Sequence, residues 1–197
     1  LLTQTLPPMR KQLILASAPL AIGLLLASCG GGGHDHAAAD HTDMMKADST
    51  AKAELAARET GVRAVFEAIN TGNLDNIGDH VAENFVDHQQ DPSITTTGIQ
   101  GLKDMVGLLR GAYPDYHQEI VSMSTTGDMT FVHFHMKGTN SGPWGAMPAT
   151  GKTMDVMGVD VLRFENGKAV EHWGYMEEMK MMTQLGLMPE PGAEEKK

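Results

Sequence analysis

The 197-residue sequence contains one cysteine, Cys29, which excludes a disulfide framework and a zinc site built from several thiolates. Basic residues are few: 15 Lys and Arg stand against 25 Asp and Glu, for a formal net charge of −10. Because phosphate binding needs a basic surface, we expect no nucleic-acid partner. Aromatic residues make up only 5%, whereas methionine occurs 15 times, so we expect Met to fill core space that Phe usually fills.

The one long apolar run, Leu13 to Leu26, follows Arg10 and Lys11 and is too short for a comfortable membrane span. It ends in Leu-Ala-Ser-Cys-Gly, which resembles the lipobox of bacterial lipoproteins. The resemblance implies that residues 1–28 are a signal peptide and that a lipid on Cys29 anchors the protein to a membrane. We therefore expect a location in the bacterial cell envelope, facing away from the cytoplasm. The alternative is an ordinary secretory signal with a coincidental cysteine.

Residues 29–50 are rich in Gly, His, Asp and small residues, a composition that cannot build a core, so we expect a flexible tether. Imidazole and carboxylate groups are suitable ligands for a transition metal, but a soluble spacer explains the same composition. The possible ligands are His34, His36, His41, Asp35 and Asp40. We expect no defined metal site here. A folded domain is expected over 51–190, followed by a charged tail over 191–197.

The first part of this domain has helical periodicity. One stripe comprises Leu55, Val62, Val65, Phe66 and Ile69, and its helix should end at Asn70-Thr71-Gly72. Asn73 can cap a short second helix that carries Leu74, Ile77 and Val81 and leads to Asp87-His88. A third helix presents one apolar face and ends near Gly111 and Pro114. That face comprises Leu102, Met105, Val106 and Leu109.

The period then changes to two, which predicts strands over 116–124, 129–137, 152–164 and 168–176. Asn166-Gly167 is the strongest hairpin signal, because a type I′ turn needs positive φ at both positions. Thr126-Gly127-Asp128 is a second expected turn. Helices followed by an antiparallel meander indicate an α+β domain.

Several segments in this order resemble the SnoaL-like polyketide cyclase family, part of the nuclear-transport-factor-2-like superfamily. They are VFEAINTGNLDNIGDHVAENFVDH, GIQGLKDMVGLLRGAYPD, GVDVLRFENGK, VEHW and QLGLMP, and together they cover about residues 55–190. The resemblance implies a conical α+β barrel, with three N-terminal helices packed on a strongly curved, mainly antiparallel sheet that encloses an apolar pocket.

The family's polyketide cyclases use an aspartate for acid–base work in an intramolecular aldol closure. At the matching position this sequence has Gly174, which cannot carry a proton. The histidine that supports that aspartate falls on Asp160, and an asparagine near the pocket falls on Asp87 or His88. The resemblance therefore implies the fold and a pocket, but does not carry the cyclase activity across.

Strand alternation places Asp160 on one face with Met154, and His172 on one face with Met176. By resemblance both faces are concave, so we expect Asp160 and His172 to form a catalytic acid–base pair poised near neutrality, with His88 assisting. A structural hydrogen bond between two strands is the alternative. The expected pocket-lining residues are Phe85, Asp87, Tyr113, Phe134, Trp144, Met154 and Met176. His133 and His135 belong on the outer face.

The sequence contains no dinucleotide fingerprint or P-loop, so we expect no cofactor. The leading hypothesis is a lipid-anchored domain that binds a small apolar organic molecule and performs a cyclase-, isomerase- or hydratase-type proton transfer. The alternatives are a protein that binds such a molecule without catalysis and a structural envelope protein. The outer sheet face could also support a homodimer.

Overall fold

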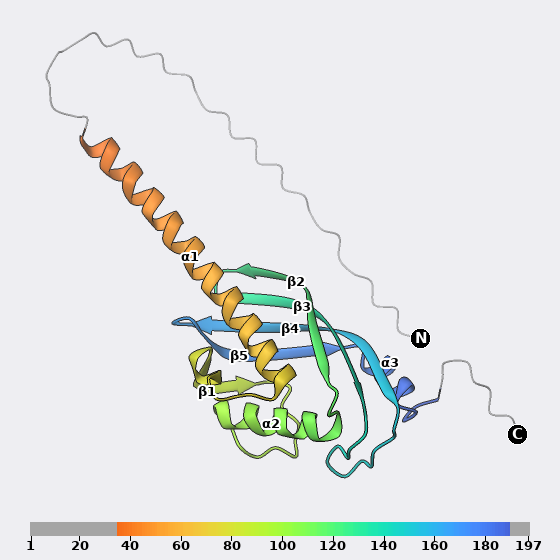
Figure 1. Ribbon diagram of the computed structural model, residues 1–197. Helices are drawn as coiled ribbons and strands as arrows, with labels where there is room; N and C mark the ends of the chain where they lie inside the picture. Colours follow the sequence, from red (N-terminus) through yellow and green to blue (C-terminus); the bar gives the residue numbers. More distant parts are fainter. Residues whose placement is uncertain (1–34, 190–197) are drawn as a thin grey trace, which may run out of the picture. The chain divides into compact units, whose positions relative to one another are not determined.

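Five strands form one sheet in the computed structural model, which describes residues 35–189 (Figure 1). Their spatial order is β1-β5-β4-β3-β2. The chain divides into residues 1–40 and 41–197, and all elements except the start of α1 belong to the second unit. The elements of the described residues are α1 (Asp35–Thr71), the 3-10 turn η1 (Ile77–Asp79), β1 (Val81–Asp87), α2 (Gly98–Ala112), β2 (His117–Thr126), β3 (Met129–Thr139), β4 (Thr153–Glu165), β5 (Lys168–Met176) and α3 (Glu178–Gln184).

Strands β2 to β5 form the antiparallel meander that the sequence predicts. The β4–β5 turn has φ of 50° at Asn166 and 79° at Gly167, the two positive values that a type I′ turn requires. Gly127, in the β2–β3 turn, also has a positive φ, of 58°. The prediction of an α+β fold with a mainly antiparallel sheet is confirmed.

Strand β1 corrects the predicted second helix. Residues 77–79 form only a single 3-10 turn, and the segment that leads to Asp87 is a strand, paired in parallel with β5. Its buried apolar residues are Val81 and Phe85. The helical spacing of Leu74, Ile77 and Val81, on which the prediction rests, runs across a loop, the 3-10 turn and the start of β1, which explains the wrong prediction.

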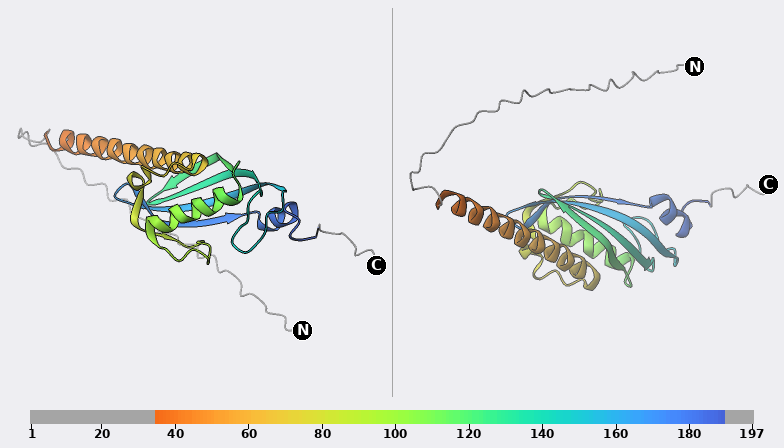
Figure 2. Two further views of the ribbon diagram at one scale, coloured as in Figure 1. Left: turned by 60° about the horizontal axis from the view of Figure 1, so that its bottom comes forward. Right: turned by 90° about the horizontal axis from the view of Figure 1, so that it is seen from above.

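Helices α1 and α2 cover the same face of the sheet (Figure 2). Val62 and Phe66 of α1 are buried, and Val106 of α2 is buried, as their periodicity predicts. Leu55, expected on the same stripe as Val62, is instead 37% exposed. The N-terminal helical layer therefore consists of α1, α2 and the 3-10 turn between them.

The predicted flexible tether is corrected over part of its length. Residues 35–50 belong to α1, whereas residues 29–34, with the glycine run, lie outside the described residues. Alanine is the strongest helix former, and the alanines of this segment favour helix once the glycines have ended. Cys29 and the signal-peptide prediction also lie outside the described residues.

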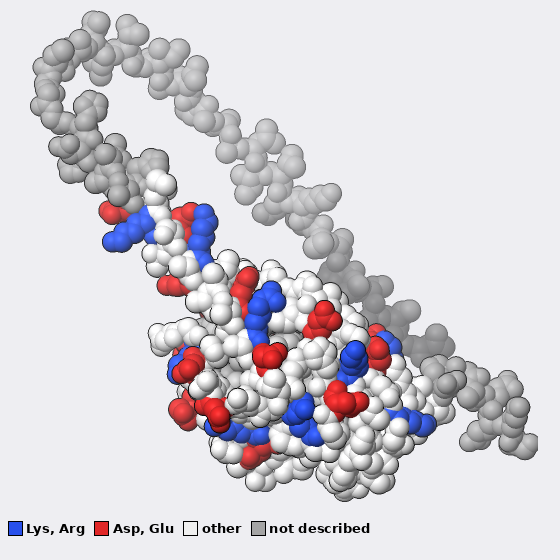
Figure 3. Space-filling view, in the orientation of Figure 1, with Lys and Arg blue, Asp and Glu red and all other residues white. Residues whose placement is uncertain are grey.

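The two faces of the sheet differ as the alternation predicts. On β3, Val132, Phe134 and Met136 are buried, while Phe131 between them is 41% exposed. On β4, Met154, Val156 and Phe164 are buried on the helix-covered side. On the surface in Figure 3, acidic and basic side chains are interspersed.

Candidate functional site

A cavity of about 840 Å³ lies between the helices and the concave face of the sheet. This volume suits a small organic molecule. Side chains of α1, α2, α3 and the strands line it, and most of them are apolar. The residues expected from the sequence to line a pocket all border this cavity: Phe85, Asp87, Tyr113, Phe134, Trp144, Met154 and Met176.

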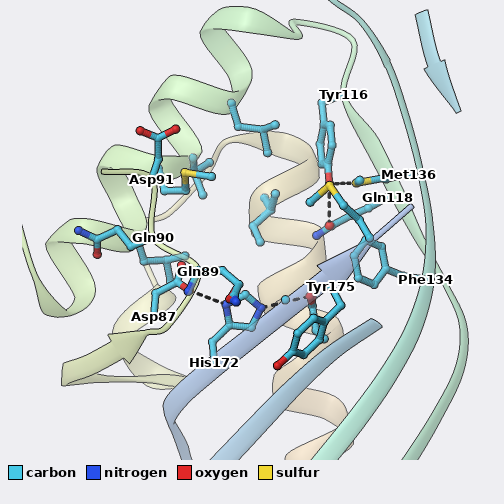
Figure 4. A pocket seen from close by; sticks show the side chains of 18 of the residues that line it. Asp87, Gln89, Gln90, Asp91, Tyr116, Gln118, Phe134, Met136, His172 and Tyr175 are labelled. Carbon is cyan, nitrogen blue, oxygen red and sulfur yellow. Dashed lines mark hydrogen bonds and ion pairs between the residues drawn. The ribbon is translucent and has the colours of Figure 1, made fainter. Parts of the chain in front are cut away.

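His172 lies in this cavity between two carboxylates (Figure 4). Its Nδ1 is 2.9 Å from Oδ1 of Asp87, and its Nε2 is 3.1 Å from Oδ1 of Asp160. The parallel register pairs Asp87 directly with His172, and the antiparallel register pairs Asp160 with Gly174, two residues further along β5. The three side chains thus come from three adjacent strands, β1, β5 and β4, in that order.

Two carboxylates change the protonation that the sequence predicts for His172. Burial by itself lowers the pKa of His172, but the hydrogen bonds and negative charges of Asp160 and Asp87 outweigh it and raise the pKa to about 10. Burial raises the pKa of Asp87, yet the hydrogen bond and charge of His172 dominate, so that pKa is lowered overall. The imidazole is therefore protonated at neutral pH. The expectation of a pair poised near neutrality is corrected, because it omitted Asp87.

The lack of a side chain at Gly174 makes room for the Asp87–His172–Asp160 cluster. A Cβ built there would lie 3.1 Å from Cε1 of His172 and 3.3 Å from Oδ1 of Asp160. Both contacts are tighter than ordinary van der Waals distances. The position of the family's catalytic aspartate thus directly adjoins Asp160 and His172, and their present arrangement depends on the absence of a side chain at 174.

His88 lies apart from the other two residues proposed as catalytic. Its ring stacks on Trp173 with centroids 4.4 Å apart, and its Nε2 is 2.9 Å from Oε2 of Glu171. It does not border the cavity, because it follows Asp87 directly and successive strand residues face opposite sides. His88 is therefore removed from the set of candidate catalytic residues.

Another imidazole–carboxylate pair, besides His88–Glu171, lies on the outer face of the sheet. His135 Nε2 is 2.7 Å from Oδ1 of Asp155, and neither residue borders the cavity. This pair resembles His172–Asp160 in chemistry but not in surroundings, so it offers a matched control.

Sequence reasoning missed a polar group on β2. Gln118 is 6% exposed and borders the cavity, and the Tyr116 hydroxyl donates a hydrogen bond of 3.0 Å to its Oε1. Among the described side chains, Gln118 Nε2 is the buried polar atom that has no hydrogen-bond partner. Tyr116 and Gln118 are two residues apart, so strand alternation could have placed both on the inner face. Burial and the charge of Asp160 raise the pKa of Tyr116, which keeps its hydroxyl protonated.

Two loops meet at Trp144. Its Nε1 donates a hydrogen bond of 2.9 Å to Oδ2 of Asp91, in the β1–α2 loop. Its ring packs edge-on against Tyr113, with centroids 6.2 Å apart. All three residues border the cavity, so this contact closes one part of its wall.

Among residues 43–189, whose side chains the structure describes, no group of three or more His, Cys, Asp or Glu is arranged to hold a metal ion. No helix within residues 35–189 combines the length and apolarity that a membrane crossing requires.

Solved structures with the same fold come from several bacteria. A proposed polyketide cyclase from Bacillus cereus is 26% identical, with a TM-score of 0.57 over 67% of this chain and 82% of its own. TsrD from Streptomyces laurentii is 20% identical, with a TM-score of 0.62 over 68% of this chain and 97% of its own. AclR from Streptomyces galilaeus, described as a proposed hydroxylase, is 23% identical, with a TM-score of 0.59 over 70% and 86%.

No protein of curated function matches the sequence. The model of the SnoaL-like polyketide cyclase family, however, matches residues 59–185, which include the whole polar cluster and nearly all of the sheet and helices that surround it. This chain belongs to the SnoaL-like polyketide cyclase family.

Proposed function

We propose that the domain catalyses cofactor-independent proton transfer on a small, mainly apolar molecule that carries a carbonyl group. The observation that carries the proposal is the Asp87–His172–Asp160 cluster in an otherwise apolar cavity. A carboxylate in such a cavity can remove a proton from a carbon next to a carbonyl. The remaining enolate either regains the proton elsewhere, which is isomerisation, or attacks a second carbonyl of the same molecule. In the second case the attacked carbonyl opens to an alkoxide, which takes the proton back from the carboxyl group as the ring closes.

Asp160 is the proton acceptor in this proposal. Its Oδ1 is held by His172, and among the described residues it has no other hydrogen-bond partner, so Oδ2 is available to the substrate. Asp87 keeps His172 protonated and oriented through Nδ1. The cation then offsets the negative charge that develops during proton removal. Asp87 and His172 therefore act on the reaction through Asp160.

The substitutions in the family pattern support this assignment. The family's aspartate is replaced by Gly174, while a carboxylate is gained at Asp160, whose Oδ1 is 3.3 Å from the Cβ position at 174. The carboxylate has thus moved to the adjacent strand and remains in the same part of the cavity. Other chemistry on this fold is indicated by AclR, a proposed hydroxylase, so the fold alone does not choose the reaction.

The test is deuterium exchange at carbon in D2O, with the purified full-length chain and 2-tetralone or 1-indanone as probes. Both are apolar ketones with exchangeable protons next to the carbonyl, and mass spectrometry counts the deuterium incorporated. We expect exchange above the buffer rate, lowered about a hundredfold by Asp160→Asn. His135→Gln, which alters the outer pair, should leave the rate unchanged.

Equal exchange by the wild type, Asp160→Asn and buffer would contradict the catalytic proposal. If the probes nevertheless bind in the cavity, the second candidate function is favoured: binding of an apolar molecule without turnover. The specific observation behind that candidate is Gly174, where the family's acid–base residue is missing.

We also propose that Cys29 is lipid-modified and anchors the domain to a membrane of the bacterial cell envelope, on the side away from the cytoplasm. The support is the Leu-Ala-Ser-Cys-Gly sequence after a basic residue pair and an apolar run. Expression in bacteria with labelled palmitate should label the wild type and leave it in the membrane fraction. Cys29→Ser should lose both properties, and an unlabelled wild type would contradict the anchor.

A further inference from the structure

Gln118 has a feature that the acid–base cluster does not explain. A buried amide whose NH2 group has no hydrogen-bond partner costs free energy, and most buried polar groups are satisfied. Its Oε1 accepts a hydrogen bond from the Tyr116 hydroxyl, which leaves Nε2 as the free donor. Figure 4 shows Gln118 projecting into the cavity between Met136 and Phe134. These apolar neighbours offer a water molecule few of the two to four partners that it needs.

Gln118 and Asp160 occupy different positions on the sheet. Gln118 pairs with Met136, and Asp160 pairs with Val132, so two strand steps and four residues of register separate them. In a flat sheet this is a span of about 16 Å between Cα atoms. The curvature of the sheet and the inward reach of both side chains shorten it. The two polar groups therefore come from different strands of the lining, with Phe134 of β3 between those strands, although the charge of Asp160 still reaches Tyr116, the hydrogen-bond partner of Gln118.

The charge of the lining limits what can bind. Of the described residues that border the cavity, none is Lys or Arg, whereas Asp87, Asp91, Asp160 and Glu178 are acidic. The protonated His172 is already shared by two of these carboxylates. A carboxylate or phosphate on the ligand would find no cationic partner and would be repelled. An uncharged oxygen, by contrast, suits the uncharged NH2 group of the Gln118 amide as its hydrogen-bond donor.

We infer that Gln118 Nε2 donates a hydrogen bond to an uncharged carbonyl oxygen of the ligand, at a subsite other than that of Asp160. This inference rests on the proposed function, because it takes the same cavity as the substrate site. It narrows the substrate class to uncharged apolar molecules with a carbonyl oxygen at a different subsite from the carbon that loses the proton. Gln118 is a binding and specificity residue, and it takes no part in proton transfer.

The test compares 9-fluorenone with fluorene, which has the same rings but no oxygen. Fluorenone has no proton next to its carbonyl, so its binding is independent of the proton-transfer step. With the full-length wild type we expect fluorenone to bind about tenfold tighter than fluorene. Gln118→Met, which keeps the approximate size and removes both donors, should abolish this preference without weakening fluorene. Asp160→Asn should retain the preference.

A second measurement does not depend on the folding of a variant. The infrared C=O stretch of fluorenone bound to the wild type should lie below its value in hexane, as a hydrogen-bonded carbonyl requires. In Gln118→Met the stretch should return toward the hexane value. An unshifted stretch in the wild type, or a tenfold preference that survives in Gln118→Met, would overturn the inference. If the wild type prefers fluorenone to fluorene but does not catalyse deuterium exchange, the proposed function alone would be contradicted.

The ligand charge provides a further comparison. Methyl 9-fluorenone-2-carboxylate and the free 9-fluorenone-2-carboxylate differ little in size but by one negative charge. We expect the anion to bind at least tenfold more weakly than the ester. Equal or tighter binding of the anion would contradict the inferred class of uncharged ligands.

Discussion

Asp87 and His172 face each other across the parallel β1–β5 pair, and the carboxylate Oδ1 is 2.9 Å from the imidazole Nδ1. Since Nε2 of the same ring is bonded to Asp160, neither ring nitrogen is left for solvent. The two carboxylates together stabilise the cation and keep the ring in one orientation. In this cluster His172 is a fixed positive charge at neutral pH, which leaves Asp160 as the proton acceptor in the reaction proposed above.

Asp87→Asn should lower the pKa of His172 from about 10. The amide can still occupy the space of the carboxylate, but it carries no charge to stabilise the imidazolium. We expect the pKa to drop by about one to two pH units, observed by NMR titration of the His172 ring. Asp155→Asn, which alters the outer His135 pair, should leave the pKa of His172 unchanged. An unchanged pKa of His172 in Asp87→Asn would mean that Asp160 alone stabilises the protonated imidazole.

The stability of the domain should fall as the pH rises above neutrality. His172 has a pKa of about 10 in the folded protein and about 6.5 when unfolded, so its contribution is complete below pH 6.5 and is lost as the pH rises to about 10. The steepest loss expected from one proton is about 1.4 kcal/mol per pH unit. Urea denaturation at pH 6.5, 8 and 9.5 measures this loss in the free energy of unfolding. His172→Gln should flatten this dependence, and an equally steep curve in that variant would assign it to other groups.

Gly174→Ala should disturb the cluster although it adds only one methyl group. The Cβ would lie 3.1 Å from Cε1 of His172, so the ring or β5 must shift. We expect a loss of about 1–2 kcal/mol in the free energy of unfolding and slower deuterium exchange by about tenfold or more. Gly107→Ala is the control, because a Cβ there meets nothing within 4 Å and α2 should gain stability. Unchanged exchange in Gly174→Ala would contradict a role for the cluster geometry.

Alternation allowed much of the sheet and part of the site to be predicted from the sequence. The side chains of β4 and of β5 that share a face follow from the period of two, and the family resemblance put the faces of Asp160 and His172 on the same concave side. The Asn166-Gly167 turn fixed the hairpin that joins their strands. The apolar residues on the same face also followed, because β4 buries Met154 and Phe164.

The rest of the site depends on features that are not local in the sequence. The helical spacing of Leu74, Ile77 and Val81 extends into the start of β1, and this concealed the strand that brings Asp87 to His172. The partner of a parallel strand lies about 85 residues away, so no nearby pattern indicates it. The missing partner of Gln118 Nε2 depends on every surrounding atom, which a sequence pattern does not contain.

The Asp91–Trp144 hydrogen bond should control how fast a ligand leaves the cavity. Trp144→Phe removes the Nε1 donor and keeps an aromatic ring near Tyr113. We expect fluorenone to dissociate several-fold faster, measured by stopped-flow displacement, while the free energy of unfolding changes by less than about 1.5 kcal/mol. The two loops would then separate more readily.

Trp173→Phe is the matched control, because the sequence has two tryptophans and Trp173 stacks on His88 away from the cavity. This variant should leave the dissociation rate unchanged. Its remaining Trp144 should keep the fluorescence change on fluorenone binding, whereas Trp144→Phe should lose most of it. Equal dissociation rates in the wild type and Trp144→Phe would contradict a gating role for the Asp91–Trp144 contact, because the ligand would then leave by a path that this contact does not obstruct.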